Sequence, residues 1–174
     1  NGVDLITVVS GTVGGDVSLG TGNNFSIDAD TFLMTGGSVT GTVFGDRGVD
    51  TITLEGGTAN AVTANSGNDM ITLDGAAISG AINAGNNNDT VMLLSGSAGT
   101  VDGGNNADTI TLDGATVNGA LRGGNGADLI TVSSGTAGGN VHLGTGNNFS
   151  TDADTFLMTG GSVTGTVFGD RGVD

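Results

Sequence analysis

Aspartate residues recur along the chain at nearly constant intervals, which makes them the first candidates for chemistry. The intervals are 19 or 20 residues, with two of 26. Carboxylates repeated at one fixed position suit a hard divalent cation, above all Ca²⁺, which takes 6–8 oxygens from carboxylates and backbone carbonyls. We therefore predict that these aspartates, called the D residues below, are metal ligands: Asp4, Asp30, Asp50, Asp69, Asp89, Asp108, Asp128, Asp154 and Asp174.

The composition also favours a cation as the partner. The chain has 18 acidic and three basic residues, a net charge of −15, 36 glycines and no cysteine. This charge repels nucleic acid and anionic membrane surfaces, and no apolar run approaches the ~20 residues of a membrane span. His142 is the only histidine, so the ligands that favour Zn²⁺ or Cu²⁺ are scarce. We expect several Ca²⁺ ions per chain, no nucleic-acid partner and no membrane insertion.

The D residues belong to a tandem repeat. Residues 125–174 match residues 1–50 with six differences, so a 124-residue unit is followed by the start of a second one. No boundary interrupts the pattern, and we expect residues 1–174 to form one continuous segment. Repeats of about 20 residues are typical of solenoids, in which each repeat buries its apolar face only by stacking on its neighbours.

Apolar residues recur two, four, nine and twelve or thirteen residues after each D residue. Asp69, for example, is followed by Ile71, Leu73, Ile78 and Ile82. The alternation predicts a strand, and glycines then predict a turn into a second strand. We predict an all-β parallel β-solenoid of about eight coils, with the acidic loops along one edge and coils starting near residues 4, 30, 50, 69, 89, 108, 128 and 154. An antiparallel β-sandwich is the alternative fold, but it does not require an aspartate at one fixed corner of every unit.

Stacking gives the acidic edge a reason to bind cations. Neighbouring coils of a solenoid lie ~4.8 Å apart, so the D residues would form a line of like charges. Each neighbouring pair costs ~1 kcal/mol in water and a few kcal/mol at an effective dielectric constant near 20. A divalent cation between successive aspartates converts this repulsion into attraction.

The loop before Asp128 adds a family resemblance. Residues 123–131 read Gly-Gly-Asn-Gly-Ala-Asp-Leu-Ile-Thr and resemble the nonapeptide of RTX (haemolysin-type) calcium-binding repeats, and residues 103–111 lack one glycine of it. The one-sided acidic corner is most similar to the Ca²⁺-bound solenoid segment of giant bacterial adhesins. The resemblance implies secretion from Gram-negative bacteria and Ca²⁺ held between coils by D side chains and loop carbonyls. The implied carbonyls belong to Gly123, Asn125, Gly104, Asn106, Gly85, Asn87 and Ser66.

The two 26-residue units carry six extra residues in the acidic corner. Asp28 and Asp152 lie in these insertions and could widen the metal site or add another, although a protruding loop is the simpler interpretation. Asp46 and Asp170 each precede an arginine. They are either solvated ion pairs or additional metal ligands.

The repeat predicts a structural role and no enzymatic activity. Catalysis needs a unique constellation that interrupts the repeat, and His142 is replaced by Ser18 in the equivalent position. We expect a Ca²⁺-stabilised segment of a secreted surface or matrix protein, such as an adhesin stalk or a biofilm or surface-layer filament. Because a solenoid needs capped ends, we expect a continuation of the same chain or other copies to associate end to end or laterally.

The alternative function is ice binding by a flat threonine-rich face. Outward positions of the first strands carry threonines such as Thr51, Thr53, Thr109 and Thr111. Apolar residues such as Met70 interrupt these rows, and threonine is in any case a favourable strand residue.

Overall fold

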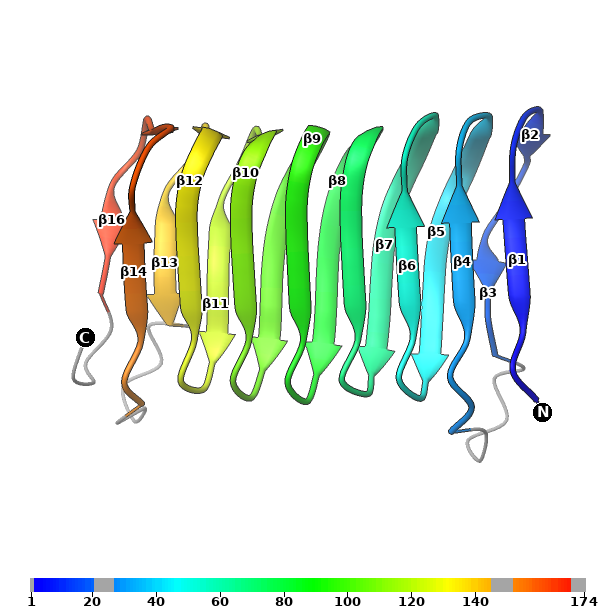
Figure 1. Cartoon of the computed structure of the whole chain (residues 1–174), viewed down its shortest axis with the longest axis horizontal. Helices are drawn as coiled ribbons and strands as arrows, with labels where there is room; N and C mark the ends of the chain where they lie inside the picture. Colours follow the sequence, from blue (N-terminus) through cyan, green and yellow to red (C-terminus); the bar gives the residue numbers. More distant parts are fainter. Residues whose placement is uncertain (1, 21–26, 145–151, 170–174) are drawn as a thin grey trace.

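The computed structural model describes residues 2–20, 27–144 and 152–169, and all of its regular elements are β-strands. Every strand pair in this part of the chain is parallel. The strands stack into a solenoid of about six turns that are paired on both sides, with one further coil at each end (Figure 1). The predicted parallel β-solenoid is confirmed, and the antiparallel sandwich is wrong. The first and last described coils pair on one side only.

The first face of the solenoid holds the strands that follow the D residues. They lie side by side in chain order across Figure 1, and β8 and β9 continue around the turn onto the other face. These strands are β1 (Leu5–Val8), β4 (Thr31–Met34), β6 (Thr51–Leu54), β8 (Met70–Asn86), β9 (Thr90–Asn105), β10 (Thr109–Val117), β12 (Leu129–Ala137) and β14 (Thr155–Met158).

The second face carries the return strands, which run down the back of Figure 1 towards the acidic corner. They are shorter in the end coils, where β2 and β3 replace one long strand. These strands are β2 (Thr12–Val13), β3 (Val17–Ser18), β5 (Ser38–Arg47), β7 (Thr58–Ser66), β11 (Leu121–Asn125), β13 (Val141–Gly144), β15 (Ser162–Val163) and β16 (Val167–Phe168).

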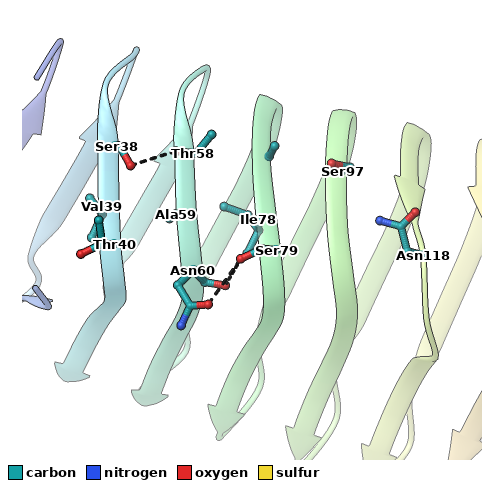
Figure 2. Close-up of a pocket in the computed structure, with 11 residues that line it drawn as sticks. Ser38, Val39, Thr40, Thr58, Ala59, Asn60, Ile78, Ser79, Ser97 and Asn118 are labelled. Atoms are coloured by element: carbon teal, nitrogen blue, oxygen red, sulfur yellow. Dashed lines mark hydrogen bonds between the residues drawn. The ribbon is translucent and has the colours of Figure 1, made fainter. Parts of the chain in front are cut away.

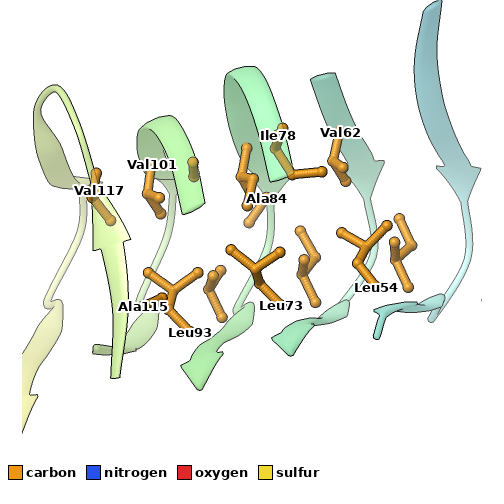
Figure 3. Close-up of a cluster of buried hydrophobic side chains, with 14 of the residues drawn as sticks. Leu54, Val62, Leu73, Ile78, Ala84, Leu93, Val101, Ala115 and Val117 are labelled. Atoms are coloured by element: carbon orange, nitrogen blue, oxygen red, sulfur yellow. The ribbon is translucent and has the colours of Figure 1, made fainter. Parts of the chain in front are cut away.

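The core lies between the two faces and is formed by the predicted apolar columns. Leu54, Leu73 and Leu93 make one row, which faces a second row that includes Val62 and Val101 (Figure 3). All five side chains are fully buried. Burying one such side chain contributes about 1.5–3 kcal/mol, so each coil depends on the coils above and below it.

The last described coil is an exception to the predicted core. Phe32 and Met34 are fully buried, but their equivalents Phe156 and Met158 are not, and Met158 is 45% exposed. The expectation that Met158 packs in the core is therefore wrong for this coil. The reason is that β14 pairs only with β12 and no further strand of the described residues covers it.

The acidic corner turns the chain through two left-handed residues, four and two positions before the D residue. In one coil these are Asn65 and Gly67, with φ of 80° and 147°, and in the next they are Gly85 and Asn87, with φ of 116° and 79°. Glycine and asparagine tolerate this backbone region better than other residues. This explains why Gly and Asn fill the loops, and it returns the chain to the first face at the D residue.

Candidate cation site at the acidic corner

The D residues form a hydrogen-bonded ladder inside the acidic corner. From Asp30 to Asp154, the Oδ1 atom of each D residue accepts a hydrogen bond from the backbone N–H of the D residue in the preceding coil, at N···O distances of 2.6–2.8 Å. From Asp30 to Asp154 these side chains are at most 4% exposed. Each carboxylate thus ties two coils together, which is a structural role that needs no metal.

The second carboxylate oxygen, Oδ2, has a different environment. In five successive coils Oδ2 is buried and has no hydrogen-bond partner. An ionised oxygen that is buried without a partner costs several kcal/mol, so each of these groups must be neutralised by a proton or by a cation. The five residues are Asp50, Asp69, Asp89, Asp108 and Asp128.

Burial makes the proton a plausible occupant of these oxygens at acidic pH. Desolvation raises the pKa of Asp50 and Asp89 to about 6, of Asp69 and Asp128 to about 7 and of Asp108 to about 8. The hydrogen bond at Oδ1 opposes this rise in pKa, and in all of them except Asp89 the charges of neighbouring aspartates add to it. Near pH 8 most of these protons are held weakly, so a cation can replace them.

Small residues five positions before the D residues make room for Oδ2. A Cβ atom at Gly103 would lie 2.7 Å from Oδ2 of Asp108, and one at Gly123 would lie 2.6 Å from Oδ2 of Asp128. The backbone carbonyl oxygen of Gly123 would also contact a Cβ at Gly103. The orphaned Oδ2 and a carbonyl of the next coil therefore border the same small space, which is the donor chemistry that Ca²⁺ prefers.

Sequence reasoning proposed Gly123 as a carbonyl ligand but missed the role of this small-residue column. The five coils with an orphaned Oδ2 carry only glycine or alanine there: Gly45, Ala64, Ala84, Gly103 and Gly123. In the 26-residue units the corresponding residues are Leu19 and Leu143, which are 3% and 4% exposed. The strand register places both leucines in this column. Gly124 pairs with Gly144, which sets Leu143 beside Gly123, and Ser18 pairs with Phe44, which sets Leu19 beside Gly45.

Other loop residues implied by the resemblance follow the same path from coil to coil. Gly85 and Gly104 are register partners, so their backbones lie in equivalent positions. The carbonyl oxygen of Ser66 accepts a hydrogen bond of 2.9 Å from the N–H of Gly48. Because a carbonyl oxygen has two lone pairs, this contact leaves Ser66 able to accept a further bond.

Side-chain amides form a second ladder on the exposed part of the corner. Asn105 donates to Oδ1 of Asn86 at 2.7 Å, and Asn125 donates to Oδ1 of Asn105 at 2.6 Å. The N–H of Asn87 donates to Oδ1 of Asn106 at 3.2 Å. These contacts stabilise the loop conformation, and they involve the side chains of Asn106 and Asn125 rather than the carbonyls proposed as ligands.

Three further acidic residues lie close enough to influence the ladder. The charge of Asp46 raises the pKa of Asp50, and the charges of Asp152 and Asp102 raise the pKa of Asp128. Asp102 lies on β9, and its own pKa is raised mainly by burial. Sequence reasoning missed Asp102 because it lies outside the loop, directly after an apolar core position.

Two further predicted ligands, Asp4 and Asp28, lie at the N-terminal end of the described ladder. Oδ2 of Asp28 accepts a hydrogen bond of 2.6 Å from the N–H of Gly2. Asp4 is exposed in the first coil. Asp170 and Asp174 lie outside the described residues.

The second face carries a shallow groove of about 360 Å³ across successive coils (Figure 2). Hydroxyl, amide and small apolar groups line it. Thr58 donates a hydrogen bond of 3.0 Å to Ser38, and Ser79 donates one of 3.3 Å to Oδ1 of Asn60. The lining residues carry no charge, so none of them can serve as a general base beside the serine and threonine hydroxyls of the groove.

Residues 2–20, 27–144 and 152–169 contain no group of three acidic, histidine or cysteine side chains placed to hold one metal. An ion at the acidic corner would therefore take most of its ligands from backbone carbonyls or water. The same residues contain no helix long and apolar enough to cross a membrane.

Comparison with known proteins gives no relative. No family model, curated protein or solved structure matches the chain.

Proposed function

We propose that the chain is a Ca²⁺-stabilised structural segment, in which cations neutralise the row of buried D-residue oxygens. The observation that carries this proposal is the orphaned Oδ2 in five successive coils. The raised pKa values of these carboxyls mean that, at neutral pH and without a cation, the folded chain holds either extra protons or buried negative charges that nothing compensates. A divalent cation shared with carbonyl oxygens removes this cost and holds adjacent coils together.

Ca²⁺ suits this row better than other divalent ions. The candidate ligands are carboxylate and carbonyl oxygens, and the irregular loops can supply the flexible geometry that Ca²⁺ accepts. Mg²⁺ requires stricter octahedral geometry and keeps more of its water. The resemblance of residues 123–131 to the RTX nonapeptide supports the same choice.

The larger role that fits this arrangement is a rigid extension in a secreted protein of the bacterial surface or matrix, such as an adhesin stalk or a filament. The second unit repeats the first with six differences over its 50 residues, and such repetition lengthens a solenoid with little change of its surface. Millimolar extracellular Ca²⁺ would saturate even weak sites of this type. The partners are then Ca²⁺ and either a continuation of the chain or other copies of the repeat.

Circular dichroism at pH 8 tests the proposal. We expect β-sheet signal in 5 mM CaCl₂, its loss in excess chelator, and its recovery when Ca²⁺ is restored but not when Mg²⁺ is supplied at equal concentration. The same β-sheet signal and the same melting temperature in chelator would refute the proposal. Electron microscopy of the Ca²⁺-loaded protein would then show whether it forms fibres.

One observation favours ice binding as a second candidate function. The outward positions one and three residues after the D residues carry threonine in ten of sixteen places in the described strands. Thermal hysteresis of the folded protein would support this function. Its absence would leave the structural role alone.

A further inference from the structure

The central part of the outward side of the first face carries no charge. It consists of the residues one and three positions after each D residue, from β1 to β14, and we call it the threonine face. All sixteen are Thr, Leu or Met and none is buried, although the chain has a net charge of −15. The nearest carboxylates belong to the exposed residues Glu55, Asp74 and Asp113, five positions after their D residues and at the edge of this face. Two copies can therefore meet over the sixteen residues without placing carboxylates inside the contact.

The large apolar residues of this face form a regular pattern. They occur in pairs on two successive strands. The residue on the first strand lies one position after its D residue, and the residue on the second strand lies three positions after its own D residue, so the two are diagonal neighbours. A strand with threonine at both positions, β6 or β10, separates each pair from the next. The pairs are Leu5 with Leu33, Met70 with Met92, and Leu129 with Leu157.

The register shows that each apolar residue lies beside a threonine of the neighbouring strand. Met70 is opposite Thr90, and Thr72 is opposite Met92. The four positions thus form a square with methionines on one diagonal and the shorter threonines on the other. The exposure of the pairs is high for such residues, with Met70 44% and Leu129 37% exposed.

We propose that the threonine face binds the threonine face of a second copy of this chain, related by a two-fold axis. A two-fold axis that lies in the plane of the interface, either along or across the strands, places one diagonal of a square in one copy over the other diagonal of a square in its partner. The apolar residues of one copy then lie over the threonines of its partner, and each square becomes a cluster of four apolar side chains. This isologous arrangement is self-complementary and closes at the dimer.

The spacing explains why the partner is a copy. Apolar pairs recur every third coil, about 14 Å apart at a coil spacing of ~4.8 Å. Only a partner with the same period can engage all three pairs at once. A two-fold axis through the central pair, Met70 and Met92, places each of the three apolar pairs of one copy over a pair of the other copy.

The size of the face predicts weak association for this chain. Eight strands span about 34 Å and four residues of each span about 13 Å, so each copy contributes about 450 Å². The total of about 900 Å² is in the range of weak or transient interfaces. We expect a dissociation constant of about 0.1–1 mM, and tighter binding in longer chains because every further 124-residue unit adds two apolar pairs.

Sedimentation equilibrium of the Ca²⁺-loaded chain tests this inference. We expect a monomer–dimer equilibrium, and at least tenfold weaker dimerisation when Met70→Thr and Met92→Thr convert the central square to threonine. Val9→Ser is the matched control, because Val9 is 65% exposed outside this face and the equivalent residue in the second unit is Ser133. Dimerisation unaffected by the double substitution, or a wild-type chain that stays monomeric at 1 mM, would overturn the inference.

Cross-linking gives a second measurement that leaves the apolar residues intact. The chain has no cysteine, so Thr72→Cys on the threonine face can be compared with Ser79→Cys on the second face. A short bismaleimide should link only the first variant into dimers, and equal cross-linking of both would contradict the proposal. The inference rests on the proposed function only in needing a folded Ca²⁺-loaded chain. Circular dichroism of each sample shows which of the two has failed.

Discussion

Without calcium, raising the pH should unfold the chain, because the five orphaned D residues have pKa values raised to about 6–8 in the fold. A carboxyl whose pKa is higher in the folded than in the unfolded state stabilises the fold while it is protonated. That stability is present below the unfolded pKa near 4 and is lost as the pH rises through the folded pKa values. The window is therefore about pH 4 to pH 8.

The magnitude follows from proton linkage. Each proton that the folded state retains and the unfolded state has lost changes the free energy of unfolding by about 1.4 kcal/mol per pH unit. We count half of this because water near the corner screens part of the interaction, which gives about 3–4 kcal/mol per pH unit for five carboxyls. Because Asp50 and Asp89 lose their protons near pH 6 and Asp69 and Asp128 near pH 7, the loss between pH 5 and pH 7 is about 5 kcal/mol, comparable to the total stability of many domains.

The assay is urea unfolding followed by circular dichroism at pH 5, 6, 7 and 8, in chelator and in Ca²⁺. We expect a steep fall in stability with pH in chelator and little change in Ca²⁺, which keeps the carboxylates neutralised. The His142→Ser variant, which introduces the residue found at the equivalent position Ser18, is the control for the chain's one histidine. Equal stability of the chelated chain at pH 5 and pH 8 would refute the reasoning.

Two further substitutions separate ion binding from packing. Asp89→Asn retains an oxygen for the N–H of Asp69 but removes the anionic ligand, so the Ca²⁺ concentration at the midpoint of folding should rise several-fold. Glu55→Gln, at an exposed residue, is the control and should leave this midpoint unchanged. Equal midpoints for both variants would show that Asp89 is not a ligand. Leu73→Ala opens a cavity in the core and should lower the free energy of unfolding by about 2–5 kcal/mol in saturating Ca²⁺. Thr72→Ala, on the surface, should change the free energy of unfolding by less than about 0.5 kcal/mol. Similar losses for the two variants would contradict the placement of Leu73 in the core.

The repeat made the fold predictable. Apolar residues at constant distances from each D residue occupy one column in a solenoid, so Ile71 could be placed opposite Ile52 before any coordinates. The glycine and asparagine pattern likewise identified the acidic corner. The exposure of Met158 could not be foreseen in this way, because a column position is buried only when coils lie on both sides of it.

The geometry within the corner was less accessible to sequence reasoning. A period places Asp108 at the corner but does not show that its Oδ1 bonds to the N–H of Asp89 while its Oδ2 is left without a partner. That difference depends on the spacing between coils and on the direction in which the loop returns. The column that includes Ala84 and Gly103 was a usable signal, since only very small residues occupy it in the ordinary units, but its meaning required the position of Oδ2.

Counting bound calcium tests the central claim most directly. Equilibrium dialysis of the folded chain at pH 8, followed by metal analysis, should give about five Ca²⁺ per chain, one for each orphaned Oδ2. The Asp89→Asn variant should bind at least one fewer. A folded wild-type chain that binds at most one Ca²⁺ at millimolar concentration would contradict the account.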